Sequence, residues 1–230
     1  MLIDRVVAPY FETNCWIIAS KVAEECIIVD PGIAQPNLVN EIVTKVNEHR
    51  LKPVAVLITH GHLDHTFSVT PLTAQVPMRT FMTAADRYLL TNPMGALARG
   101  GVTEQLLNAF GVDKFKEPDQ VVELEDFQRF ELAGMQLTAI FAPGHTAGSV
   151  IFTIDDQQLI SGDVLFAGSI GRTDLPTGSA NQMRGTLKNR ILTLSDGLNV
   201  LPGHGGQTTI GIERVRNPYL QSDFLDQSGR

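Results

Sequence analysis

Apolar residues alternate with polar ones, or run together in short segments, along much of the chain. In the first part of the sequence such segments predict four strands: LIDRVV (2–7), CWIIAS (15–20), ECIIVD (25–30) and PVAVLIT (53–59). One segment between them differs. PNLVNEIVTKVNEHR (36–50) has its apolar residues at the three- and four-residue spacing of an amphipathic helix. The first half of the chain therefore mixes strands with helices.

The pattern becomes less regular after residue 65. The sequence predicts a short helical stretch there, a strand near MRTFM (78–82), and a helix at TAADRYLL (83–90) with Thr83 as its N-cap. Residues 92–120 contain many glycine and asparagine turn signals around one helical piece, TEQLLNAF (103–110). We interpret them as a long insertion across the surface, of the kind that often borders an active site. Its role as a lid stays open.

Short β-rich segments return from about residue 120 and predict a second sheet. They are QVVEL (120–124), FQRFEL (127–132), MQLTAIFA (135–142), SVIFTI (149–154) and QQLIS (157–161). The end of the chain predicts a helix around 182–194, a strand at 199–202, and a last helix at 208–217 that Pro218 stops. Two β-rich parts with helices predict an α/β fold in which two sheets pack together with helices on both outer faces. A single domain over residues 1–230 fits this length.

Composition narrows the function classes. Apolar residues make up 43% and charged residues 19%, as in ordinary globular proteins. A formal net charge of -7 argues against nucleic-acid binding, which needs a basic surface. The start of the sequence does not resemble a secretory leader, and no apolar run approaches the ~20 residues that span a bilayer. We therefore expect a cytoplasmic protein with no membrane partner, in which Cys15 and Cys26 are buried thiols. The oligomeric state stays open.

Five of the six histidines follow strand-like segments in turns rich in glycine or proline: His60, His62, His65, His145 and His204. The sixth, His49, is near a helix end and receives no function. Three of the five occur in THGHLDH (59–65). Residues two apart in extended backbone point the same way, so His60 and His62 can hold one cation, while Asp64 and His65 point elsewhere. Two sets of ligands suit two neighbouring cations better than one tetrahedral ion.

Three further motifs each place one ligand after a predicted strand. APGHTAGS supplies His145, ISGDVLF supplies Asp163, and LPGHGG supplies His204. The donors are then all nitrogen and oxygen, whereas structural zinc sites are often closed and rich in sulfur. A non-catalytic metal-binding module is therefore the weaker alternative. The sequence also lacks the GxSxG motif of serine hydrolases.

The ordered motifs THGHLDH, APGHTAGS, SGDVLF, GRTD and PGHG resemble the metallo-β-lactamase superfamily, and within it the glyoxalase II-like branch. TNCWII, IVDPG (with Asp30) and IERVRNPYL support the resemblance. It implies an αββα sandwich with two mixed sheets. It also implies two divalent metal ions, zinc before iron or manganese. One ion would lie on His60, His62 and His145, and the other on Asp64, His65 and His204. Asp163 would bridge them, and Asp64 and Asp163 would be the catalytic carboxylates.

The activity implied by the resemblance is that of a metal-dependent hydrolase. Two adjacent cations lower the pKa of bound water from about 15.7 toward ~7 and so supply a bridging hydroxide at neutral pH. The expected substrate is a small acyl thioester such as S-lactoylglutathione, cleaved by a thioesterase of the hydroxyacylglutathione hydrolase type. The segment 166–179 should form part of the cleft wall, where Arg172, Thr173 and Asp174 are the candidate substrate-binding residues. A salt bridge between Arg172 and Asp174 that only holds the loop is the alternative.

Other activities remain open beside hydrolysis of thioesters. Glutathione-hydrolysing relatives carry aromatic residues where this chain has Asp174 and Gly206, so the thiol carrier can differ. The main competitor is a persulfide dioxygenase, which this sequence also resembles in its THGHLDH and GRTD motifs, and this resemblance implies a single non-haem iron on His60, His145 and Asp163. PGHG keeps His204 available for a second metal, which favours hydrolysis. Lactonase and phosphodiesterase activities use the same metals on other substrates.

Overall fold

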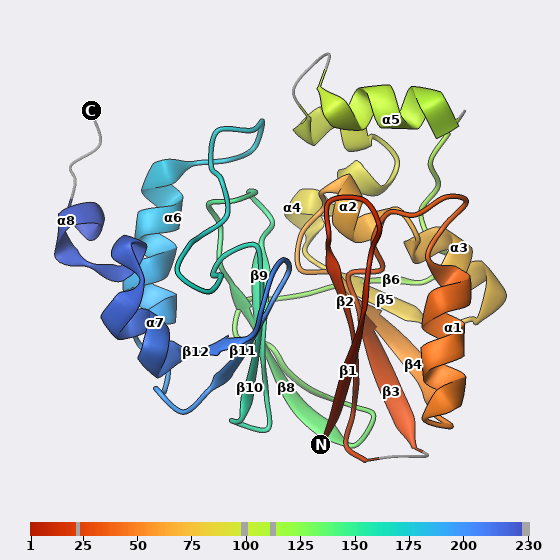
Figure 1. Cartoon of the computed structure of the whole chain (residues 1–230), viewed down its shortest axis with the longest axis horizontal. Coiled ribbons are helices and arrows are strands. Elements are labelled where there is room, and N and C mark those ends of the chain that lie inside the picture. The colour runs from red at the N-terminus through yellow and green to blue at the C-terminus, as the bar shows by residue number, and fades with distance from the viewer. Residues whose placement is uncertain (22–23, 98–100, 111–113, 227–230) are drawn as a thin grey trace.

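The elements of the protein form four layers. The computed structural model describes residues 1–21, 24–97, 101–110 and 114–226. Two sheets of six strands each pack face to face, and helices cover the outer side of each sheet (Figure 1). The predicted α/β sandwich with two mixed sheets is therefore confirmed.

The first sheet has the strand order β1-β2-β3-β4-β5-β6. Its strands are β1 (Leu2–Val7), β2 (Asn14–Ala19), β3 (Glu25–Val29), β4 (Lys52–Leu57), β5 (Arg79–Met82) and β6 (Val121–Glu123). Strands β1 to β3 are antiparallel neighbours, and β3 to β6 run parallel. The assignment of QVVEL to the second sheet is wrong, because Val121 pairs with Thr80 of β5. Apolar alternation identifies such a strand but carries no information about its partner.

The second sheet has the order β12-β11-β10-β9-β8-β7. Its strands are β7 (Arg129–Leu132), β8 (Met135–Phe141), β9 (Val150–Ile154), β10 (Gln158–Gly162), β11 (Asn199–Pro202) and β12 (Thr208–Thr209). Only β10 and β11 pair in parallel. Since β9 is antiparallel to both β8 and β10, the strands β8, β10 and β11 run in one direction. Their carboxyl ends share one edge of the sheet.

Helices cover the outer faces and the edge at which those strands end. The first sheet is covered by α1 (Val39–Glu48) and α3 (Val69–Gln75), and the second by α6 (Ala180–Thr186), a π-helical turn (Leu187–Ile191) and α7 (Ile210–Arg216). The edge elements are α2 (Leu63–Thr66), α4 (Ala84–Arg87), 3-10 turns at Tyr88–Leu90 and Pro93–Ala96, and α5 (Val102–Phe110). None of the helices in the described ranges has the length and apolar character needed to cross a bilayer.

Two predicted helix ends are confirmed in position and differ in detail. Thr83 is the N-cap residue of α4, but its hydroxyl donates to the carbonyl of Gly148 at 2.6 Å and makes no capping hydrogen bond. The last helix, α7, ends before Pro218 as predicted, but Thr208 and Thr209 form strand β12, and Pro218 starts a 3-10 turn (Pro218–Leu220) that leads to α8 (Ser222–Leu225). In each case a tertiary contact decides the local structure, which sequence signals at a helix end do not report.

The main core lies between the two sheets. Strand β2 is buried on both faces: Trp16 and Ile18 point toward the second sheet, while Cys15 and Ile17 pack under the helices. Side chains two apart share a face, so this strand contributes to two hydrophobic layers at once. Both cysteines, Cys15 and Cys26, are buried and free. The result is a rigid support for the loops at the strand ends.

Candidate metal centre

All seven predicted donors lie just beyond the carboxyl ends of strands, five in loops and two, Asp64 and His65, in the short helix α2. The THGHLDH segment follows β4 of the first sheet, whereas His145, Asp163 and His204 follow β8, β10 and β11 of the second. The parallel direction of those three strands brings their loops to one edge, where they meet the first sheet's loop. The donors therefore come from both halves of the sandwich.

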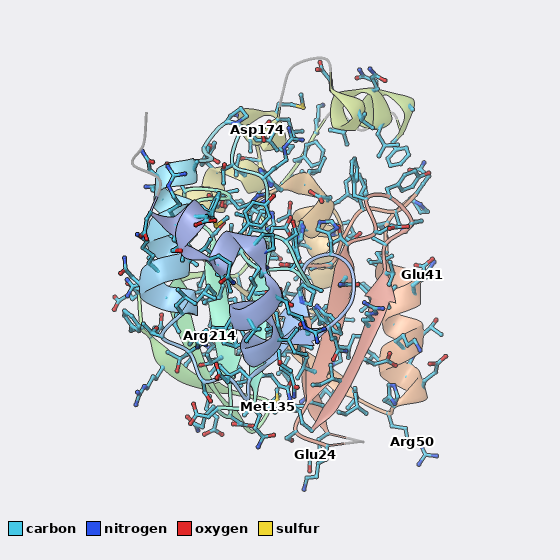
Figure 2. The ribbon with its side chains drawn as sticks, turned by 60° about the vertical axis from the view of Figure 1, so that its left-hand side comes forward. Glu24, Glu41, Arg50, Met135, Asp174 and Arg214 are labelled. Carbon is cyan, nitrogen blue, oxygen red and sulfur yellow. The ribbon has the colours of Figure 1, made fainter. Side chains whose placement is uncertain are left out.

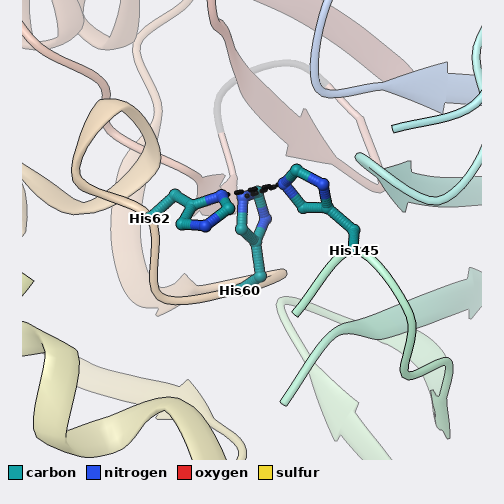
Figure 3. Close-up of side chains that lie close together, drawn as sticks. All are labelled: His60, His62 and His145. Carbon is teal, nitrogen blue, oxygen red and sulfur yellow. Dashed lines mark hydrogen bonds between the residues drawn. The ribbon is translucent and has the colours of Figure 1, made fainter. Parts of the chain in front are cut away.

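Three histidines form the first donor set (Figure 3). Nε2 of His145 lies 2.8 Å from Nδ1 of His62 and 3.2 Å from Nε2 of His60. All three side chains are buried. The structure thus brings together the two residues that share one side of the extended THGH segment with a histidine that is 83 positions away from His62.

Asp64, His65 and His204 form the second donor set. Nε2 of His204 lies 3.1 Å from Nε2 of His65 and 3.4 Å from Oδ2 of Asp64. Asp163 lies between the sets, with Oδ1 3.4 Å from His65 Nε2 and Oδ2 3.5 Å from His145 Nε2. A Cβ added at Gly203 would overlap Oδ1 of Asp163. Glycine at that position is what lets the backbone pass so close to the carboxylate.

The outer nitrogens of three histidines fix which nitrogen faces the centre. Nδ1 of His145 donates to the carbonyl of Arg172 at 2.7 Å, and Nδ1 of His204 donates to the carbonyl of Phe11 at 2.9 Å. Nδ1 of His65 bonds to Oδ2 of Asp30 at 2.9 Å. In the neutral imidazole the inner Nε2 then carries a lone pair. Hydrogen bonds of this kind orient histidines that bind metals.

These donors fit divalent metal ions. The lone pairs of His60, His62 and His145 point at one another, and such a cluster is costly without a cation or proton between them. Oδ1 of Asp163 is buried and has no hydrogen-bond partner among the described residues. Asp30, His60 and His65 also lie close enough together to hold a metal ion. We do not interpret them as a third site, because Asp30 bonds to the outer nitrogen of His65.

The two sets differ in their affinity for protons. Burial lowers the pKa of His60 and brings the pKa of His62 to about 3. Burial also acts against a charged His204, but its hydrogen bonds to Asp163 and Asp64 outweigh this and raise its pKa to about 11. For Asp64, burial is outweighed by the charge on His65 and the hydrogen bond to His204, and its pKa falls to about 2. His60 and His62 of the first set are therefore neutral, whereas the second set holds ionised groups.

Two buried carboxylates outside the predicted donor set hold the loops in place. Asp30 accepts hydrogen bonds from the backbone N–H and the hydroxyl of Thr59, at 2.8 and 2.6 Å, besides its bond to His65. The sequence marks Asp30 only through the IVDPG motif.

Asp86 of α4 is fully buried and accepts from Gly61 N at 2.7 Å, Gly148 N at 2.8 Å and Thr146 Oγ1 at 2.7 Å. Gly61 separates His60 from His62, and Thr146 follows His145, so Asp86 joins a loop of each sheet. Nothing in TAADRYLL distinguishes Asp86 from an exposed helix residue, and sequence analysis missed it.

Comparison with known proteins places the chain in a family. The model of the metallo-β-lactamase superfamily matches residues 8–204. The chain belongs to the metallo-β-lactamase superfamily. Members of this superfamily are hydrolases, so the chain belongs to a group of metallo-hydrolases.

Relatives within the superfamily match nearly the whole chain. An uncharacterised protein of Mycobacterium tuberculosis is 38% identical over 228 residues, which cover 96% of this chain and 98% of the relative. The hydroxyacylglutathione hydrolase GloC of Haemophilus influenzae is 30% identical over 225 residues, which cover 96% of this chain and 99% of that protein. These relatives are consistent with the glyoxalase II-like branch.

Solved structures of the superfamily share the fold. BLEG-1, a B3 metallo-β-lactamase, has a TM-score of 0.81 and 28% identity, covering 95% of this chain and 99% of that chain. The protein TTHA1623, crystallised in a di-iron-bound form, has a TM-score of 0.76 and 30% identity, covering 94% and 100% respectively.

A pocket of about 430 Å³ opens onto the centre of this superfamily member. Its floor consists of donor residues, and its walls are Phe11, Leu97, Gly101, Val102, Phe166, Gly171, Arg172 and Leu175. Leu97, Gly101 and Val102 belong to the predicted insertion, so these residues of it border the centre. Residues 98–100 and 111–113 of it lie outside the described ranges, and its role as a lid stays untested.

The three predicted substrate-binding residues are placed differently from one another. Arg172 lines the pocket, but its guanidinium donates to both carboxylate oxygens of Asp174 at 2.7 Å. Thr173 is half-buried and is not among the lining residues. Asp174 is exposed at the same end of the molecule as α5, far from Glu24 at the opposite end (Figure 2). The loop therefore presents an ion pair beside the pocket.

Proposed function

We propose that this metallo-hydrolase is a thioesterase that cleaves S-acyl thiol conjugates such as S-lactoylglutathione, with zinc as its two divalent ions. The observation that carries the proposal is the pair of complete donor sets, with Asp163 between them, at the floor of a pocket large enough for a small ligand. The name of the 30% identical Haemophilus relative, hydroxyacylglutathione hydrolase, points to the same class of substrate.

The seven donor residues would have distinct roles in this reaction. His60, His62 and His145 would hold one cation, Asp64, His65 and His204 the other, and Asp163 would contact both. Bound divalent cations supply a water of lowered pKa and polarise the carbonyl under attack. Asp64 and Asp163 are ionised and so act as ligands, not as acids. A thiolate leaves readily, and the reaction therefore needs no acidic side chain.

Persulfide dioxygenation with a single iron is the alternative. Its three ligands, His60, His145 and Asp163, are all present, and Asp163 Oδ2 lies 3.5 Å from His145 Nε2. His204, however, completes a second set of nitrogen and oxygen donors, for which a single-iron reaction has no use. This favours the hydrolase.

Metal analysis combined with activity measurement tests the proposal. The purified protein should contain close to two equivalents of zinc and hydrolyse S-lactoylglutathione. His204→Ala should lose about one equivalent and most of the activity. His49→Ala is the matched control, because the His49 side chain bonds to Asp4, at 2.8 Å, and to none of the donor residues. A protein with one iron, no zinc, and oxygen consumption on glutathione persulfide would be a dioxygenase, and a two-metal protein inactive on all thioesters would not be a thioesterase.

A further inference from the structure

The walls of the pocket are mostly apolar. Beside the donors at its floor, the lining consists of five apolar side chains, two glycines and Arg172. Phe166 lies against the metal-ligand residue His204, with their ring centroids 5.9 Å apart, so the apolar wall reaches the centre itself. A group attached to the reacting carbonyl would therefore lie against hydrocarbon, which favours an apolar group over a charged one.

Arg172 is the only lysine or arginine among the described lining residues, and its charge is already paired. Its Nε and Nη2 each donate to one oxygen of Asp174 at 2.7 Å. This two-point contact occupies the Nε/Nη2 edge of the guanidinium, one of the two edges through which an arginine can bind a carboxylate. The hydrogen bond from Arg172 lowers the pKa of Asp174 to about 2, so Asp174 is negatively charged at neutral pH. A substrate carboxylate that approached Arg172 would be repelled by this negative charge.

On these observations, and resting on the proposed thioesterase function, we propose that the pocket selects thioesters of uncharged thiol carriers over those of anionic carriers such as glutathione. Asp174 is the residue that sets this preference, because it neutralises Arg172. The substrate class is thus an acyl thioester with a neutral, largely apolar carrier.

Two thioesters test this preference, S-lactoylglutathione and S-lactoyl-N-acetylcysteamine. They share the same reacting acyl group and differ in the charge of the thiol carrier. The wild-type protein should show at least about tenfold higher kcat/KM for the neutral carrier. Asp174→Asn keeps the shape of the side chain and removes its charge, and should reduce this ratio at least about fivefold, mainly by lowering KM for the glutathione conjugate. Asp226→Asn is the matched control, since Asp226 is an exposed aspartate paired with Lys188 in the helix layer. It should leave the ratio unchanged.

Measuring the binding of non-hydrolysable thioethers tests the carrier preference without requiring catalysis. S-hexyl-N-acetylcysteamine should bind the zinc-loaded protein more tightly than S-hexylglutathione, and Asp174→Asn should reduce the difference. If neither thioester is hydrolysed but this binding order holds, the proposed thioesterase function fails and the carrier selectivity stands. If glutathione derivatives bind or react as well as the neutral ones, or if Asp174→Asn changes neither ratio, the selectivity is refuted.

Discussion

Replacement of Asp86 by asparagine should weaken both the fold and the first donor set. Asp86 has 0% exposure, and its carboxylate accepts three hydrogen bonds from Gly61, Thr146 and Gly148. Asparagine retains one carbonyl oxygen, but its NH2 group must then face a donor. In the better orientation, NH2 replaces Oδ1, and the N–H of Gly148 loses its acceptor.

The expected loss follows from the cost of unpaired buried groups. A buried donor without a partner costs about 1–3 kcal/mol, and the remaining bonds lose the strength that the charge gave them. We therefore expect Asp86→Asn to lower the free energy of unfolding by about 2–4 kcal/mol, which is a drop in Tm of roughly 5–15 °C for a chain of this size. Because Gly61 separates His60 from His62 and Thr146 follows His145, their displacement should also weaken metal binding about 10–100-fold.

Glu213→Gln separates the effect on the metal from general destabilisation. Glu213 is another buried carboxylate, 2% exposed, and it accepts from Gly168, Thr208 and Asn217 at 2.8, 2.6 and 2.8 Å. None of these partners adjoins a donor residue. Thermal unfolding of both variants and zinc titration against a chromophoric chelator give the comparison. Equal losses of Tm with unchanged zinc affinity in Asp86→Asn would refute the reasoning, since the loops would then position the histidines without Asp86.

Two further predictions concern the second donor set. Asp30→Asn removes the charged acceptor that orients His65, so zinc affinity at this set should fall about 10–100-fold in the same titration; an unchanged affinity would contradict the role of Asp30. Because the pKa of His204 is raised to about 11, the metal-free protein holds a proton there at pH 7. Zinc must displace that proton, so affinity rises with pH, whereas His62, with a pKa of about 3, has no proton to release at pH 7. Calorimetry in two buffers of different ionisation enthalpy should detect release in the wild type and much less in His204→Ala; equal release in both would contradict it.

The sequence predicted the strands well but not all of their partners. Alternation places β8 within a residue of MQLTAIFA, because Met135, Leu137 and Ala139 on one face are buried between the sheets while Gln136 on the other face is exposed. The sheet to which Val121–Glu123 belongs depends on the path of the chain after the insertion at 92–120. The local sequence does not specify this path. The donor residues could be predicted from the sequence because each donor motif contains glycine and follows a predicted strand. The positioning role of Asp86 was not, because its three partners come together only in the folded chain.

The donor loops belong to two separate stretches of sequence. Residues up to 123 build one sheet and supply four donors, and residues from 129 onward build the other and supply three. Neither stretch by itself supplies all the donors for both ions. The three histidines of the first donor set come from both stretches. Metal binding is therefore coupled to the packing of the two sheets. A partly unfolded form in which the sheets separate would release its ions, and bound ions stabilise the packed form.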